Sequence, residues 1–262
     1  MPVDKIALRW LGTAGFHLRF RGKELLLDPF LSRLPGARPA IRARPTHFRG
    51  VSLILVSHGH FDHAMDAAEL ARVSGAAIHA PLQTCAILRR QGLDPARLVP
   101  NERLSSIAWN GGTVRTIPSR HIAFDAPLIR ETLVRVLRGG VCSRLLRLLR
   151  QWPVGSNSEF LLNLGGYRIL FSGSGGGDWQ ALSALRPHCC LLPFAGRSDP
   201  GDFTLKALRL LRPETVVLHH FDDFFPSFCV EYPVEEFRRR AARELPGIRL
   251  IVPEPETDIL LP

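Results

Sequence analysis

The sequence predicts an α/β domain in which two mixed β-sheets pack face to face with helices on their outer sides. Short apolar runs typical of strands recur along the chain, and segments with helical spacing lie between them. The succession of strands followed by helices occurs twice, which favours a four-layer αβ/βα sandwich. No fixed-period repeat or linker divides the chain, so we expect residues 1–262 to form a single domain.

The expected strands are short and apolar, and several of them end at Gly, Pro or Asn. They cover residues 5–11, 15–20, 24–28, 52–57, 76–80, 113–117, 159–164, 167–172, 190–194 and 215–219. Arg21-Gly22 and Gly165-Gly166 separate strand pairs and indicate hairpin turns. Apolar residues three and four positions apart predict helices over residues 64–73, 82–91, 179–185, 204–211 and 234–244.

Residues 127–152 differ from the rest and predict a helical lid inserted into the domain. Gly139-Gly140 divides the segment into two short helices, as a hairpin or a kinked pair. Its Leu and Val residues alternate with six arginines, against the single acid Glu131. One interpretation is a basic amphipathic surface that contacts anionic lipid or a phosphorylated substrate. The other is an insertion whose apolar face packs on the core while its arginines are solvated.

The composition is that of a globular protein, with 45% hydrophobic residues and no apolar run near the ~20 residues that a bilayer requires. The N-terminus lacks the apolar stretch of a secretory signal, so we expect a cytoplasmic location. Five cysteines without a CxxC pair indicate reduced thiols rather than a disulfide framework. The net charge of +10 comes almost entirely from arginine, which fits anionic partners or a bias in genome composition.

A cluster of metal-ligand side chains follows the buried strand expected at residues 52–57. The segment His58-Gly59-His60-Phe61-Asp62-His63 holds three histidines and an aspartate within six residues. Imidazole nitrogens and carboxylate oxygens are the ligands that zinc prefers where thiolates are absent. A loop at the end of a rigid strand fixes their directions. His58 and His60 can hold one ion, while Asp62 and His63 can reach a second.

This segment is similar to the HxHxDH signature of the metallo-β-lactamase superfamily, and the resemblance extends over nearly the whole chain. Residues 9–16 (Arg-Trp-Leu-Gly-Thr-Ala-Gly-Phe) resemble the opening of the branch that contains ascorbate-6-phosphate lactonase and N-acylphosphatidylethanolamine phospholipase D. Asp28, in Leu27-Asp28-Pro29, matches the family's early aspartate, which supports the metal loop and is not itself a ligand. His121 falls at the third histidine of the family, and His220 at the last ligand. His219 is adjacent, but the family's His-aromatic-Asp order favours His220.

The resemblance implies two groups of ligands and a hydrolytic reaction. His58, His60 and His121 bind one Zn²⁺ ion, while Asp62, His63 and His220 bind the other; Mn²⁺ or Fe are alternatives. Two ions ~3.5–4 Å apart share a hydroxide that attacks a carbonyl or phosphorus. Asp62 both ligates the metal and orients the nucleophile, which makes it the expected catalytic residue.

One position departs from the family pattern. The family places a bridging aspartate just after a strand, where this chain has Ser174 within Ser172-Gly173-Ser174-Gly175-Gly176-Gly177-Asp178. Either Asp178 folds back across the glycines, or the second ion is weakly held, or the site uses one ion. We favour an altered second site, because Asp178 also fits as the N-cap of the helix at residues 179–185.

The leading hypothesis is therefore a metal-dependent hydrolase that cleaves an ester, lactone or phosphodiester in a small-molecule or lipid substrate. An anionic substrate would suit the arginines, and Arg197 is a candidate to hold its phosphate or carboxylate. The alternatives are a nucleic-acid-processing nuclease and a degraded metal-binding protein. Against the nuclease, the chain lacks room for an added nucleic-acid-binding domain, and its arginines lie among leucines rather than aromatic residues.

Overall fold

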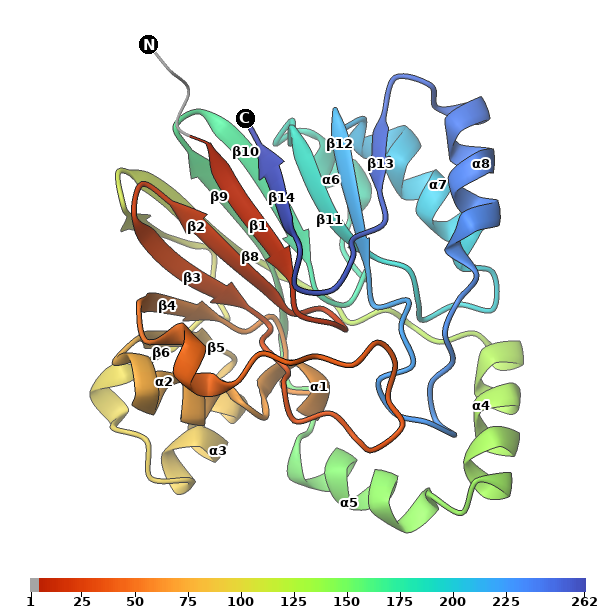
Figure 1. Ribbon diagram of the computed structural model, residues 1–262, viewed down its shortest axis with the longest axis horizontal. Helices are drawn as coiled ribbons and strands as arrows, with labels where there is room; N and C mark the ends of the chain where they lie inside the picture. Colours follow the sequence, from red (N-terminus) through yellow and green to blue (C-terminus); the bar gives the residue numbers. More distant parts are fainter. Residues whose placement is uncertain (1–4) are drawn as a thin grey trace.

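Two seven-stranded sheets run through the computed structural model, which describes residues 5–262 (Figure 1). The first sheet has the order β14-β1-β2-β3-β4-β5-β6. Its strands are β1 (Ile6–Trp10), β2 (Phe16–Phe20), β3 (Lys23–Leu27), β4 (Val51–Leu55), β5 (Ala77–Ala80), β6 (Leu98–Pro100) and β14 (Asp258–Leu261). Pairing is antiparallel from β14 to β3 and parallel from β3 to β6.

The second sheet repeats this plan in the order β13-β12-β11-β10-β9-β8-β7. Its strands are β7 (Ser105–Trp109), β8 (Gly112–Ser119), β9 (Asn157–Leu164), β10 (Tyr167–Ser172), β11 (Cys189–Pro193), β12 (Thr215–His219) and β13 (Arg249–Ile251). Pairing is antiparallel from β7 to β10 and parallel from β10 to β13. Both sheets are mixed, which confirms the predicted fold class.

Strands β3 and β4 of the first sheet end in residues that are apolar on both faces, because each face packs against a different layer. Leu25 and Leu27 belong to the core between the sheets, whereas Leu26 belongs to the core under the helices. Leu55 and Ile54 divide in the same way on β4. Since successive side chains of a strand point to opposite faces, these runs are continuous rather than alternating.

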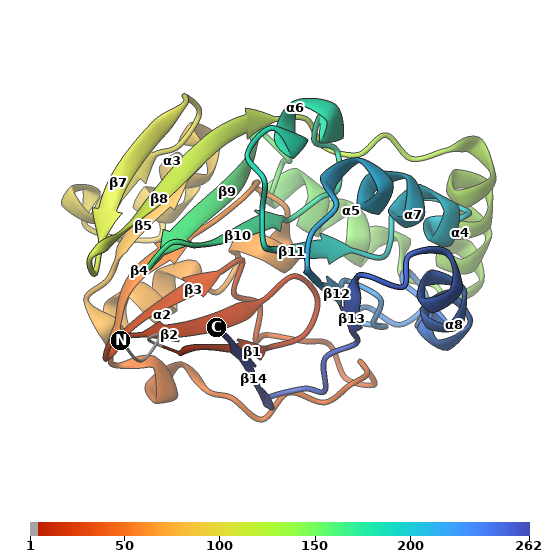
Figure 2. The same cartoon turned by 90° about the horizontal axis from the view of Figure 1, so that it is seen from above.

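Helices cover the outer faces of the sandwich (Figures 1 and 2). The first sheet carries α1 (Phe61–Ala64), α2 (Ala67–Ser74) and α3 (Leu82–Arg90). The second is flanked by α6 (Trp179–Ser183), α7 (Pro200–Leu211) and α8 (Val234–Glu244). Two 3₁₀ turns, η1 (Pro45–Phe48) and η2 (Pro95–Arg97), lie in the connections. This arrangement is the four-layer sandwich that the strand and helix order predicts.

The arginine-rich segment forms two helices, α4 (Ala126–Arg138) and α5 (Cys142–Gln151), outside both sheets (Figure 1). The carboxylate of Asp125 caps α4 by accepting a hydrogen bond of 3.1 Å from the Leu128 N–H. Gly139 and Gly140 separate the two helices, at the position that the sequence predicts. Gly140 has a positive φ of 65°, which allows the chain to change direction there.

Two features of the fold differ from the sequence prediction. Residues 64–73, expected as one helix, belong to α1 and α2, which are interrupted at Met65 and Asp66. The buried Asp66 carboxylate accepts hydrogen bonds from the backbone N–H groups of Leu31 (2.6 Å) and Ser32 (2.8 Å). Asp66 therefore stabilises the tertiary structure, by holding a loop that is distant in sequence. The spacing of apolar residues, from which the helix was predicted, could not reveal this contact. Strands β6, β7, β13 and β14 were not predicted, because they are short and partly exposed and show weak apolar patterns.

All five cysteines are free thiols, and Cys85, Cys189 and Cys190 are buried. Burial raises the pKa of Cys85 to about 11, and it raises that of Cys189 to about 12. These thiols are therefore protonated and inert at neutral pH. Within residues 5–262, no helix combines the length and the apolar character that crossing a bilayer demands.

Candidate metal centre

The predicted metal ligands meet at one edge of the sandwich, because each follows the carboxyl end of a strand. His58 and His60 come after β4 in the first sheet, whereas His121 and His220 come after β8 and β12 in the second. Ligand sites of layered α/β proteins lie at this end of the strands. The two halves of the chain therefore contribute side chains to the same place.

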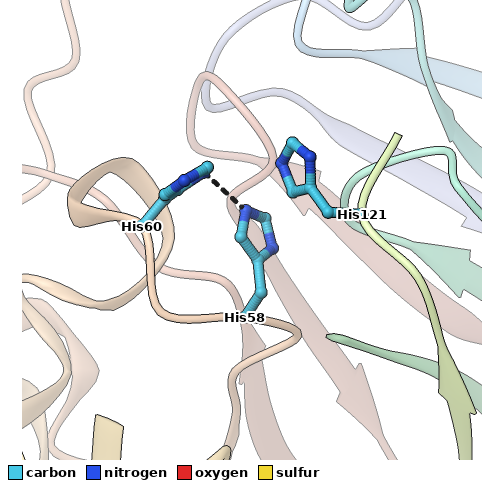
Figure 3. Close-up of side chains that lie close together, drawn as sticks. All are labelled: His58, His60 and His121. Carbon is cyan, nitrogen blue, oxygen red and sulfur yellow. Dashed lines mark hydrogen bonds between the residues drawn. The ribbon is translucent and has the colours of Figure 1, made fainter. Parts of the chain in front are cut away.

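Three histidines form the first ligand group (Figure 3). Ring nitrogens of His58, His60 and His121 all lie within 4.8 Å of one another. His58 Nε2 and His60 Nδ1 are 3.2 Å apart. Ligand atoms bound at ~2.0–2.1 Å around a tetrahedral zinc ion are separated by ~3.3 Å, so this spacing suits such an ion.

Hydrogen bonds on the far sides of two of these rings fix which nitrogen is free. His121 Nδ1 donates to the Ile122 carbonyl at 2.9 Å, so its Nε2 carries the lone pair. His58 Nδ1 lies 2.9 Å from Ser57 Oγ, and that hydroxyl donates in turn to Asp28. His58 Nδ1 therefore carries the proton, and Nε2 is the free nitrogen. The donor set fits a metal ion, since the free nitrogens are those that lie together.

Asp28 supports both ligand groups from beneath. One carboxylate oxygen accepts from the Ser57 N–H at 2.6 Å. The other accepts from the Ser57 hydroxyl, and His63 Nδ1 donates to it at 2.7 Å. Asp28 is fully buried, and its contacts orient the rings of His58 and His63. This is the supporting role that the family resemblance implies.

The second ligand group consists of Asp62, His63 and His220, whose ligand atoms also lie within 4.8 Å of one another. Asp62 Oδ2 is 3.4 Å from His63 Nε2 and 3.3 Å from His220 Nε2. His219 is not part of either group: it is fully buried, and its Nε2 lies 3.1 Å from the Ser172 carbonyl oxygen. The structure thus brings His220 rather than its neighbour to the site.

The first ligand group is neutral at pH 7. Burial lowers the pKa of His58 well below its usual value, lowers that of His60 to about 4, and also lowers that of His121. Neutral imidazoles are the form that binds metal ions. The three lone pairs therefore need no deprotonation before an ion binds.

The second ligand group, in contrast, contains charged side chains at pH 7. Burial disfavours the charge of His63, but the carboxylates of Asp62 and Asp28 outweigh it and raise the pKa to about 10. Burial likewise disfavours the charge of Asp62, yet His63 and His220 hold the pKa of its carboxyl well below the usual range. An ion that binds this group has to displace a proton from His63.

Ser174 lies at the site, whereas Asp178 and Arg197 face elsewhere. Ser174 lines the cavity above the ligands, and its Oγ donates to Asn157 Oδ1 at 3.0 Å. The Asp178 carboxylate caps α6 by accepting from the Ala181 N–H at 3.0 Å. The Arg197 guanidinium lies 5.5 Å from the centre of the Phe203 ring. Asp178 and Arg197 are both absent from the cavity lining.

A cavity of about 590 Å³ opens over both ligand groups. Apart from the metal ligands, its walls are mainly apolar and come from α4, α5 and the loop after β12. Leu128, Val136 and Leu145 are examples from the two helices, and Phe224 and Val230 from the loop. Arg135 also lines the cavity, and its guanidinium donates to Thr132 Oγ1 at 2.9 Å.

A buried polar chain beneath Ser174 was not found by sequence reasoning. Asn157 donates to Ser119 Oγ at 2.9 Å, and Ser119 donates to Glu159 Oε1 at 2.9 Å. Glu159 is fully buried, and burial raises the pKa of its carboxyl to about 7. The sequence signal was a charged residue at the start of an otherwise apolar strand, which is also common at strand ends.

Three residues near the site adopt the left-handed backbone conformation, which is uncommon for residues other than glycine. They are Thr13 (φ 50°), Asp28 (φ 39°) and His220 (φ 59°). The His220 N–H donates to the Thr13 carbonyl at 2.8 Å, so two of these residues hold each other in place. Such strain concentrates at functional sites.

Comparison with known proteins places the chain among metal-dependent hydrolases. A UPF0173 metal-dependent hydrolase of Pyrococcus horikoshii is 28% identical over 239 residues, which cover 89% of this chain and 91% of the relative. One from Methanosarcina mazei is 28% identical over 260 residues, covering 98% and 99%. The solved structure of Igni18, a metallo hydrolase from Ignicoccus hospitalis, has the same fold, with a TM-score of 0.70 at 18% identity and coverage of 98% and 99%.

The fold and these relatives define the class of the protein, a hydrolase with the metallo-β-lactamase fold. A family model described as the beta-lactamase superfamily domain matches residues 23–221, which is most of the chain. The chain therefore belongs to the beta-lactamase superfamily.

Replacing Gly59 with alanine should distort the metal-binding loop. A Cβ atom there would lie 2.2 Å from the Pro153 carbonyl oxygen and 2.9 Å from Thr84 Oγ1. We expect the free energy of unfolding to fall by about 1–3 kcal/mol, as for other overpacked sites, together with a loss of bound metal. Urea unfolding and elemental analysis measure both. Gly247→Ala is the control, because nothing lies within 4 Å of its Cβ; equal behaviour of the two variants would contradict the prediction.

Glu159 should make the stability of the metal-free protein depend on pH. Because its folded pKa of about 7 lies above the ordinary value of 4.5, the folded state holds the proton more tightly. The free energy of unfolding should therefore fall as pH rises from 4.5 to 7. The contribution is up to about 3 kcal/mol.

Glu159→Gln should remove this part of the pH dependence, as measured by urea unfolding at several pH values in the presence of a chelator. The exposed Glu214→Gln is the matched control and should retain the wild-type slope. A Glu159→Gln profile parallel to that of the wild type would show that this carboxyl does not titrate as the structure indicates.

Proposed function

We propose that the protein hydrolyses an ester, lactone or phosphodiester bond in a small-molecule or lipid substrate, with the reaction at the first ligand group. The observation that carries this proposal is the convergence of three neutral histidine nitrogens at the floor of an apolar cavity. A cytoplasmic location is part of the proposal, because the five cysteines are free thiols.

His58, His60 and His121 would hold a divalent ion, with Zn²⁺ as the first candidate and Mn²⁺ or Fe as alternatives. When bound, such an ion lowers the pKa of a water molecule toward neutrality and polarises the bond to be cleaved. Asp62 would accept a hydrogen bond from the attacking water and orient it. Ser57 and Asp28 fix the orientation of the His58 ring through hydrogen bonds.

The second ligand group would hold an ion more weakly than the first. Ser174 supplies a neutral hydroxyl where the family pattern has a bridging carboxylate, and this hydroxyl already donates to Asn157. Asp178 does not compensate, since its carboxylate caps α6. We therefore propose one firmly bound ion and a second site that is partly filled at best.

The cavity supports a substrate with an apolar group next to the bond that is cleaved. Each buried CH₂ group of a substrate contributes up to ~0.8 kcal/mol, so the apolar walls favour chain-like or ring-like hydrocarbon groups. Arg135 would give the cavity a cation that suits an anionic substrate. The site does not support the nuclease hypothesis. Nucleic-acid channels combine basic grooves with aromatic platforms, whereas the walls of this cavity are mainly apolar.

Removal of one ligand tests the proposal directly. The wild-type protein should bind about one divalent ion and hydrolyse p-nitrophenyl acyl esters, lactones or bis-p-nitrophenyl phosphate in a metal-dependent way. His60→Ala and Asp62→Ala should each reduce kcat/KM by at least about a hundredfold, and His60→Ala should also lose metal. His47→Ala is the matched control, since His47 is exposed and outside the cavity.

Longer acyl chains should raise kcat/KM, up to the chain length that fills the cavity. If metal-loaded wild-type protein leaves all three classes of bond intact, the proposed reaction is wrong. If the protein also binds no metal, the degraded-site alternative is favoured.

The Ser174→Asp variant tests the asymmetry of the two ligand groups. A carboxylate at this position should complete the second group and raise the metal content from about one to about two ions per chain. Elemental analysis after dialysis against a fixed free metal concentration measures the change. Ser174→Ala should leave the content near one, and a wild type that already holds two firmly bound ions would contradict the prediction.

A further inference from the structure

The α4–α5 pair exposes an unusual amount of apolar surface. Among the described residues, most of the large hydrophobic side chains that are exposed lie in residues 124–149, and this set is defined here as the apolar rim. Its members, with their exposed fractions, are Phe124 (48%), Ile129 (54%), Leu133 (56%), Val134 (41%), Leu137 (61%), Leu146 (52%) and Leu149 (36%). Such a concentration on one face indicates a surface that another apolar phase covers.

The rim is continuous along the helices. Ile129, Leu133 and Leu137 are four residues apart on α4 and therefore share one face. Leu146 and Leu149 are three apart on α5. Both helices lie outside the sheets, at the periphery of the molecule (Figure 1). Because these leucines stand at helical spacing, their exposure follows from the helices themselves and not from an irregular loop.

Exposed arginines accompany the rim. Arg130 and Arg138 on α4, and Arg144, Arg147 and Arg150 on α5, are all exposed. The only acid in these two helices is Glu131. A second copy of this surface would bring like charges together, which disfavours self-association through the rim. Leucines with interspersed arginines match a membrane interface with anionic headgroups, where basic side chains lie at headgroup level and apolar ones go deeper.

The rim also surrounds the entrance of the cavity. Phe124, Ile129, Leu133, Leu146 and Leu149 are exposed and at the same time line the cavity that reaches the histidines. A bilayer in contact with the rim would therefore meet an apolar passage to the candidate metal centre. A lipid chain could then move from one apolar phase into another without crossing water.

We propose that the α4–α5 surface docks on the face of an anionic bilayer and presents the cavity entrance to it. The protein binds peripherally, with the rim leucines in the interface and the five arginines at the headgroups. Building on the proposed function, this assigns the substrate to lipids or other amphiphiles that partition into the bilayer, with the apolar chain in the cavity and the scissile bond at the metal.

Vesicle sedimentation of the full chain tests the docking without any reaction. The wild type should bind vesicles of phosphatidylcholine with 30% phosphatidylserine at least about tenfold more strongly than pure phosphatidylcholine vesicles, and added salt should weaken the binding. Leu133→Asn/Leu137→Asn and Arg130→Gln/Arg147→Gln should each reduce the binding by on the order of tenfold. All four positions are exposed, so the variants should fold, which circular dichroism checks.

Matched controls separate this surface from the net charge of the chain. Arg89→Gln/Arg90→Gln changes two exposed arginines on α3, and Leu104→Asn removes an exposed leucine elsewhere. Both should bind vesicles like the wild type. Equal loss in the α3 and α4–α5 arginine variants, or no preference for anionic vesicles, overturns the proposal. So does a dimer in light scattering that Leu133→Asn/Leu137→Asn converts to monomer, since it would assign the rim to a second copy.

His60→Ala separates the docking from the proposed function. This variant should lack hydrolysis but retain vesicle binding, because His60 belongs to the metal ligands and is not one of the exposed residues of the rim. If the wild type binds anionic vesicles but hydrolyses nothing, only the proposed reaction is wrong. If it hydrolyses soluble esters but binds no vesicles, the docking is wrong and the reaction stands.

Discussion

The rest of the site depends on the hydrogen bonds that the buried carboxylate of Asp28 accepts. Asp28 lies at the end of β3 and binds Ser57 at the end of β4, so it joins two adjacent parallel strands where their ladder ends. The same carboxylate receives His63, and through Ser57 it sets the orientation of His58. A fully buried carboxylate is tolerated only when hydrogen bonds satisfy it, and Ser57 and His63 provide these bonds.

Tight packing around this carboxylate explains why the neighbouring turn is rich in glycine. A Cβ atom on Gly173 would lie 2.6 Å from Asp28 and closer still to Ser57. The second sheet can therefore approach the metal loop only where its chain has no side chain. Ser174, the next residue, instead lines the cavity, at the place where the family pattern has a carboxylate.

Much of the fold and most of the candidate site could be predicted from the sequence. The HxHxDH segment was recognisable because four ligand-type residues follow one buried strand, and His121 and His220 required the family resemblance to be placed. The role of Asp178 as the N-cap of the following helix was predicted from the sequence and is confirmed. The direction of Arg197 was not predicted, since a cation–π contact is decided by local geometry. The hydrogen-bonded series of Asn157, Ser119 and Glu159 was also hidden, because Ser119 lies on β8 and is separated in sequence by α4 and α5 from the other two residues on β9.

The two sheets share the histidines of the first ligand group, and this sharing has a mechanical consequence. His58 and His60 extend from the first sheet, whereas His121 extends from the second. An ion bound by all three would cross-link the two sheets at the edge where the ligands meet. Its binding free energy would add to the free energy of unfolding, by about 2.7 kcal/mol when the free metal is a hundredfold above its dissociation constant. Loss of the metal would then abolish the activity and lower the free energy of unfolding at the same time.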